Sequence, residues 1–208
     1  RLDGVTGVQT CALPIYVPDP ALVDELAGIP VRTHHGFSWK AMKQRVWDDS
    51  GRCCVTADSV HPPTEREPAF ACWWEAIREH SNPAIHETPV IHETMYPGYR
   101  LGCGAEIERA MDEGLTLAVD VSHIHIQISA GVLSPDTWRH LQRYSGIAEL
   151  HVSDNAGRFD SHRPLNPNTF GLGWARERAS SGLPLVLEAY MHKLSYGERR
   201  AQVELLSS

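Results

Sequence analysis

The sequence has few cysteines, and their spacing does not fit a disulfide framework or a zinc-binding knuckle. Its five cysteines include no Cys-x-x-Cys pair, and Cys53 and Cys54 are adjacent. Pairs of cysteines two residues apart are typical of structural zinc sites and of redox motifs. The pattern therefore argues against a cysteine-based zinc site. It favours free thiols in a reducing compartment, and we expect a cytoplasmic protein.

Long apolar runs, basic clusters and glycine-rich turns are also missing. No stretch approaches the roughly 20 apolar residues that a membrane helix needs, so we expect no membrane partner. The 19 Lys and Arg are scattered among 26 Asp and Glu, and the net charge of -7 argues against a nucleic-acid partner. No Gly-x-Gly-x-x-Gly turn follows an early strand, which argues against a dinucleotide-binding sheet. A small-molecule substrate is the expected partner, and the oligomeric state stays open.

Residues 1–15 fit no structural pattern. This segment has no charge between Val5 and Ile15, and it lacks the basic start and long apolar core of a signal peptide. The letters VTGVQTCALPI resemble a common sequencing adapter translated in one frame. We therefore predict that residues 1–15 are a non-native segment that packs poorly and belongs to no barrel strand. Residues 16–208 would then be a partial domain that lacks its own N-terminus.

After residue 16, segments typical of strands alternate with segments typical of helices. The predicted strands are 28–37, 52–63, 89–98, 115–126, 147–155 and 183–191, and the predicted helices are 19–28, 67–80, 104–114, 134–146, 171–182 and 195–206. This alternation indicates βαβ units and a parallel sheet. Since a complete barrel has about 250 residues, we predict an α/β fold: a (β/α)8 TIM barrel, truncated at its N-terminus, with about six of eight strands present.

Histidine is unusually frequent, with 12 in the chain, and many of these residues stand at the ends of the predicted strands. The strand-end residues that can bind a metal are His34 and His35, His61, Glu93, Asp120 with His123, His151, and Glu188. The C-terminal ends of barrel strands meet at one face. The next loop adds Asp160 and His162, which would share one side of an extended segment. Such a cluster is costly unless a cation lies within it, so we predict a metal site.

Two alternatives qualify this prediction. Taken singly, each residue has a structural explanation; for example, Asp120 or Ser122 could bind backbone N–H groups in a capping turn. The letters IHET also occur twice, at 85–88 and 91–94, which makes Glu87 a rival to Glu93. We prefer Glu93, because the turn MYPG that follows it places it at the end of a strand.

The series formed by Glu93, Asp-x-x-His at 120–123, His151 and Glu188 resembles the xylose-isomerase-like TIM barrels. That superfamily includes sugar phosphate isomerases and epimerases, endonuclease IV and the multinuclear iron oxidases, and the resemblance covers residues 30–208. It implies that Glu93, Asp120, His151 and Glu188 hold one metal ion. It also implies that His123 and Arg158 bind substrate. Further metal ligands would be His35 (or His34 in its place), His61, His123, Asp160 and His162.

This ligand set suits Mn, Mg, Co, Zn or Fe(II), and the number of ions stays open. In the isomerases that the chain resembles, Glu93 and Glu188 would be the catalytic acid and base that move a proton beside a metal-polarised carbonyl. The sequence narrowly favours such a metal-dependent sugar or polyol isomerase or epimerase. The first alternative is a multinuclear iron oxidase acting on a peptide or small thiol substrate. A zinc phosphodiesterase of the endonuclease IV type is less favoured, because basic clusters are missing.

Overall fold

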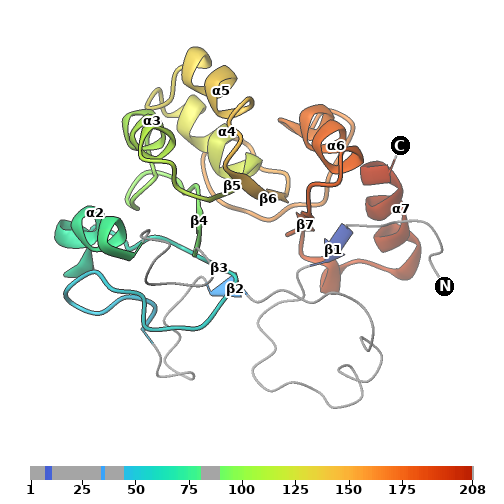
Figure 1. Cartoon of the computed structure of the whole chain (residues 1–208). Helices are drawn as coiled ribbons and strands as arrows, with labels where there is room; N and C mark the ends of the chain where they lie inside the picture. The colour runs from blue at the N-terminus through green and yellow to red at the C-terminus, as the bar shows by residue number, and fades with distance from the viewer. Residues whose placement is uncertain (1–7, 11–33, 36–44, 81–89, 208) are drawn as a thin grey trace.

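The computed structural model describes residues 8–10, 34–35, 45–80 and 90–207 (Figure 1). Its strands are β1 (Val8–Thr10), β2 (His34–His35), β3 (Ser59–Val60), β4 (Ile91–Glu93), β5 (Leu117–Asp120), β6 (Ile147–Val152) and β7 (Leu185–Leu187). Its helices are α2 (Ala69–His80), α3 (Gly104–Asp112), α4 (Val121–Ser129), α5 (Pro135–Leu141), α6 (Leu172–Ser180), the 3-10 helix η1 (Met191–Lys193) and α7 (Tyr196–Ser207). None of the described helices has the length and apolar character that crossing a bilayer requires.

All paired strands are parallel, and the order across the sheet is β1-β7-β6-β5-β4-β3-β2. Strands β3 to β7 therefore lie side by side in chain order, as the alternation of strands and helices predicts. The strands follow the inside of an open arc, and the helices lie along its outer side (Figure 1). This arrangement brings the C-terminal ends of successive strands to one edge of the sheet.

The prediction of a (β/α)8 barrel with about six of eight strands is wrong. In the part of the chain that the structure describes, β3–β7 form an all-parallel half-barrel sheet, which the short strands β2 and β1 extend at its two edges. No pairing joins β1 to β2 in this part, so the sheet is open. The alternating pattern indicates strand direction and helix coverage. Closure depends instead on strand number, tilt and stagger, which local sequence does not encode.

Strand β1 lies within residues 1–15, for which the sequence predicts no barrel strand, and the structure pairs β1 with β7 at one edge of the sheet. Val8 pairs with Leu185, and Thr10 pairs with Leu187 in the same parallel register. Without β1, β7 would be the edge of the sheet. An edge strand presents unpaired backbone groups that a short extended segment can bind, whatever its side chains. The predicted domain boundary between residues 15 and 16 lies outside the described residues.

Packing and polar groups occupy opposite faces of the sheet. Successive side chains of a strand point to opposite sides. In β5 and β6, Val119, Leu150 and Val152 belong to the buried hydrophobic core between sheet and helices. Asp120 and His151 alternate with these residues and therefore point to the concave face of the arc. The same strands thus supply both the apolar core and the polar groups of the candidate site.

Strand β5 is shorter than the predicted strand 115–126, because α4 begins directly after Asp120. The carboxylate Oδ1 of Asp120 accepts hydrogen bonds from the backbone N–H groups of Ser122 at 2.6 Å and His123 at 3.4 Å. An N-cap carboxylate of this kind binds the first N–H groups of a helix, which have no partner within the helix. The immediate turn into α4 brings His123 beside the end of the strand.

The loop that follows β4 is fixed by the fully buried side chain of Gln127 in α4. Its Nε2 donates to the carbonyl oxygen of Met95 at 2.5 Å and to that of Leu101 at 3.0 Å. Leu101 has a φ of 57°, which is unusual for a residue with a side chain, so tertiary contacts must hold this loop in place. The loop carries Tyr96, whose ring lies 5.0 Å from that of His123.

We predict that Gln127→Leu lowers the free energy of unfolding by about 1–3 kcal/mol, because the Met95 carbonyl loses its side-chain donor and the Leu101 carbonyl keeps only the backbone N–H of Met95. Urea unfolding followed by circular dichroism measures this change. The control is Glu75→Leu on the exposed face of α2, for which we expect a change of less than about 0.5 kcal/mol. Equal effects of the two substitutions would show that Gln127 does not hold the loop.

Candidate metal centre

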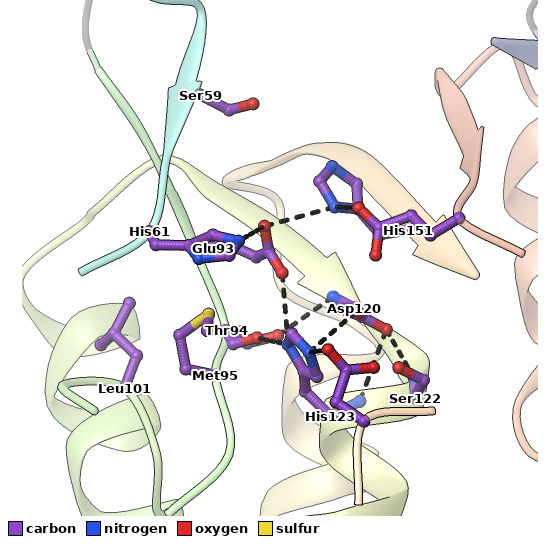
Figure 2. A network of polar contacts seen from close by, with 12 residues as sticks. Ser59, His61, Glu93, Thr94, Met95, Leu101, Asp120, Ser122, His123 and His151 are labelled. Atoms are coloured by element: carbon purple, nitrogen blue, oxygen red, sulfur yellow. Dashed lines mark hydrogen bonds and ion pairs between the residues drawn. The ribbon is translucent and has the colours of Figure 1, made fainter. Parts of the chain in front are cut away.

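Glu93, the last residue of β4, is fully buried, and histidines from four other parts of the chain surround it. Figure 2 shows three of them, His61, His123 and His151. Its Oε2 lies 3.2 Å from Nε2 of His34, 3.2 Å from Nε2 of His61 and 3.4 Å from Nδ1 of His151. Its Oε1 lies 3.2 Å from Nδ1 of His123. These contacts are close, but within the described residues neither oxygen has a donor in hydrogen-bonding geometry. Both carboxylate oxygens of Glu93 can therefore bind another group, such as a metal ion.

A second group of polar side chains lies at the start of α4. Nε2 of His123 is 3.3 Å from Oδ2 of Asp120 and 3.3 Å from Oδ2 of Asp160. The same Asp160 oxygen is 3.0 Å from Nε2 of His162. Asp120 caps α4 with its other oxygen, so one carboxylate serves both the helix and this group.

Glu188, which directly follows β7, connects the strand ends to the loop that carries Asp160. Its Oε1 is 3.0 Å from Nδ1 of His151, and its Oε2 is 3.8 Å from Nδ1 of His162. The second nitrogen of His151, Nε2, is 3.1 Å from Oε1 of Glu149. Residues from four successive strand ends and one loop therefore meet on the concave face.

The imidazoles of His34 and His123 share one arrangement, in which Nδ1 contacts a neutral protein group and Nε2 faces carboxylates. Nδ1 of His34 is 3.0 Å from Oγ of Ser59, and Nδ1 of His123 is 2.9 Å from the carbonyl oxygen of Thr94. A carbonyl oxygen only accepts, so Nδ1 of His123 carries a proton. In the neutral imidazole, Nε2 then offers a lone pair toward Asp120 and Asp160, as a metal ligand must.

The charges of this cluster shift pKa values in opposite directions. Burial raises the pKa of Asp120 to about 7. Burial also acts to raise the pKa of Glu93, but the His61, His151 and His123 imidazoles outweigh it and hold that pKa well below its usual range. Burial acts to lower the pKa of His151, but Glu93 and the other carboxylates nearby raise it well above its usual range. The carboxylates thus require positive charge among them, which protonated imidazoles or a metal cation supply.

The described residues contain buried clusters of His and Glu that could bind a metal ion. Four groups have potential ligand atoms within 4.8 Å of one another: His34, His61 and Glu93; Glu93, His151 and Glu188; Glu93, Asp120 and His123; and His34, Glu149 and His151. Glu93 belongs to three of these groups. Of the four ligands predicted for one ion, Glu93, His151 and Glu188 fall in one group, whereas Asp120 falls in the group of His123.

The sequence missed Glu149, because the segment ELH is an ordinary strand pattern. The signal that could have found it is the spacing of two between Glu149 and His151, which places both side chains on one face of β6. His34, held as the alternative to His35, contacts Glu93. Of His35 the structure describes only the backbone, and the rival Glu87 lies outside the described residues.

The loop after β6 differs from the extended Asp-x-His segment that the sequence predicts. His162 has a φ of 44°, in the left-handed region, so the alternation of an extended chain does not apply there. Asp160 and His162 nevertheless point into the cluster, because backbone hydrogen bonds between Asp154 and Arg163 close the base of the loop. Arg158, for which the resemblance implies substrate binding, is exposed on this loop.

Comparison with known proteins gives a distant likeness in structure alone. No family model matches the chain, and no curated protein matches it. The chain is similar to the solved structure of the TTHB071 protein from Thermus thermophilus, soaked with ZnCl2, with a TM-score of 0.43 and 17% sequence identity. The match covers 72% of this chain and 60% of that protein, so the chain spans about three fifths of its length. The function must therefore be argued from the site itself.

Proposed function

We propose that the chain forms the catalytic part of a metal-dependent enzyme whose centre holds more than one divalent ion, with Glu93 as the bridging carboxylate. The observation that carries this proposal is the position of Glu93. Its Oε2 lies among His34, His61 and His151, and its Oε1 lies beside His123. A carboxylate with both oxygens buried and shared between separate ligand groups suits a bridge between ions.

The number of donor side chains supports several ions over one. Among the residues that the structure describes, nine side chains converge on the centre: His34, His61, Glu93, Asp120, His123, His151, Asp160, His162 and Glu188. A single divalent ion takes about four to six ligands. One ion would therefore leave several buried donors without a partner, which is costly.

The charge of the cluster supports the same proposal. In the described part of the chain, four carboxylates face the centre, from Glu93, Asp120, Asp160 and Glu188. When ionised they carry about four negative charges, which about two divalent cations neutralise. A single divalent ion would leave about two negative charges to be balanced by imidazolium groups. Those groups could not then serve as ligands, because a ligating imidazole must be neutral at the metal-bound nitrogen.

Of the multinuclear chemistries, we favour an iron oxidase acting on a peptide or small thiol substrate over a zinc phosphodiesterase. When bound, ions of this kind would supply activation of a water ligand, and iron would also supply chemistry with dioxygen. The net charge of -7 opposes binding of a polyanionic nucleic acid. Arg158 and Phe159, the latter 78% exposed, lie on the loop that brings Asp160 to the centre. They offer a cation and an aromatic ring to a substrate.

One observation favours the isomerase as a second candidate. Glu93, His151 and Glu188 form a group that could hold a single ion between two carboxylates. In that arrangement Glu93 and Glu188 would transfer a proton between neighbouring carbons of a sugar or polyol. The metal content separates this candidate from the multinuclear enzyme.

We predict more than one bound ion per chain after loading with Fe(II), Mn(II) or Zn(II) without oxygen and removal of free metal. Inductively coupled plasma mass spectrometry measures the metal, and amino-acid analysis measures the protein. Asp160→Ala and His162→Ala should each bind fewer ions, because both remove donors from one side of the centre. The control is His140→Ala, which breaks an exposed contact of 2.6 Å with Glu108 on the protein surface. One ion per chain in every protein would support the isomerase instead.

Metal binding should also stabilise the fold. At a free metal concentration of about 100 times the dissociation constant, we expect stabilisation of about 2.7 kcal/mol per site, measured as a higher Tm that a chelator reverses. In Glu93→Gln most of this shift should disappear, because an amide cannot bridge cations as a carboxylate does. Glu108→Gln on the surface should keep the full shift. An unchanged shift in Glu93→Gln would contradict the bridging role.

The oxidase chemistry is tested with glutathione as the probe thiol. We expect the Fe(II)-loaded chain to consume dioxygen in an oxygen electrode faster than the Zn(II)-loaded chain, because zinc has no redox chemistry. Glu93→Gln mixed with the same amount of iron controls for oxidation of free metal. Equal consumption by wild type and Glu93→Gln would count against an oxidase.

A further inference from the structure

Glu149 is a buried carboxylate in the middle of β6, and its place beside His151 calls for an explanation. Glu149 is 2% exposed and His151 is 1% exposed, and the two residues lie two apart on one face of the strand. Oε1 of Glu149 is 3.1 Å from Nε2 of His151. Burying a carboxylate is costly unless it is paired. The neighbouring imidazole supplies that pairing.

The two nitrogens of His151 face different partners. Nδ1 lies 3.0 Å from Oε1 of Glu188 and 3.4 Å from Oε2 of Glu93, on the side where the ligand groups meet. Nε2 faces Glu149 on the other side of the ring. Carboxylates only accept hydrogen bonds, and they lie near both nitrogens. Within the described residues only the Nε2 contact with Glu149 has hydrogen-bonding geometry, whereas Nδ1 has no hydrogen-bond partner, so a neutral His151 keeps its proton on Nε2. Its lone pair is then on Nδ1.

We propose that Glu149 is a positioning residue that holds His151 in the Nε2–H tautomer and so presents Nδ1 to the metal centre. The effect on metal affinity rests on the proposed function, whereas the tautomer does not. Carboxylates that accept the second N–H of a ligating histidine fix its ring orientation and make it a better ligand. Glu149 would act on the centre only through His151.

A competing explanation is that Glu149 is itself a ligand, in the group with His34 and His151. Two observations favour positioning. Glu149 is two residues before His151, so its backbone lies about 6.6 Å deeper in the sheet than the strand-end groups, at about 3.3 Å per residue. His34 also directs its Nε2 toward Glu93 at 3.2 Å, while its Nδ1 binds Ser59. Both nitrogens of His34 therefore have partners other than Glu149, which argues against a shared metal site of His34 and Glu149.

The test substitution is Glu149→Gln, because the amide keeps the size of the side chain but can donate a hydrogen bond as well as accept one. In metal-free wild type, at a pH where ¹⁵N chemical shifts show a neutral His151 ring, we expect the remaining proton on Nε2. In Glu149→Gln we expect a substantial population with the proton on Nδ1. A wild-type His151 with its proton on Nδ1 would overturn the proposal without any variant.

Metal titration gives the second readout. We expect Glu149→Gln to bind Zn(II) about 10–100-fold more weakly than wild type, with the same number of ions per chain. The matched control is Glu108→Gln, the same substitution beside the exposed His140, for which affinity should not change. Loss of an ion in Glu149→Gln would show that Glu149 is a ligand and overturn its positioning role. If wild type binds no metal, the proposed function fails, and the NMR measurement still decides the tautomer.

Discussion

The need to balance the buried charge of Glu93 is the constraint on which the rest of the site depends. An ionised carboxylate with no exposed surface is costly unless cationic or donor groups surround it. Here β2, the segment after β3, α4 and β6 each direct an imidazole to within 3.4 Å of its oxygens. These imidazoles in turn lie beside Asp120, Asp160 and Glu188. The positions of the other carboxylates therefore follow from the groups that balance Glu93.

The parallel sheet makes this concentration of polar groups compatible with a stable core. Because side chains alternate along each strand, β5 and β6 direct Val119 and Leu150 toward the helices and direct Asp120 and His151 to the concave face. Apolar burial and the polar cluster are thus separated by one layer of backbone. The apolar face drives folding at about 25 cal/mol per Å² of buried surface, and the opposite face is left for chemistry.

Sequence predicts those residues of the site whose positions are determined by the direction of the strands. Glu93, Asp120, His123, His151 and Glu188 could be located because parallel strands bring their C-terminal ends to one edge. Closure into a barrel could not be predicted, since it depends on pairing between sheet edges that are far apart in the chain. The sequence did not identify Glu149 as a site residue, because a spacing of two is shared by any neighbouring residues on one face of a strand. The left-handed backbone at His162 arises from the closed loop around it and leaves no local signature.

The two carboxylate oxygens of Asp120 contact different parts of the structure, one at the start of α4 and one in the candidate metal centre. Ordering of the helix and ligand binding at the centre are therefore linked. Oδ1 accepts the first N–H groups of α4, while Oδ2 faces His123. Further along the same helix, Gln127 binds the carbonyl groups of Met95 and Leu101. Any ligand that fixes the carboxylate of Asp120 therefore also suppresses fraying at the start of α4 and steadies the loop beyond β4. Because the two equilibria are linked, a mutation that increases fraying of α4 also weakens the binding of that ligand.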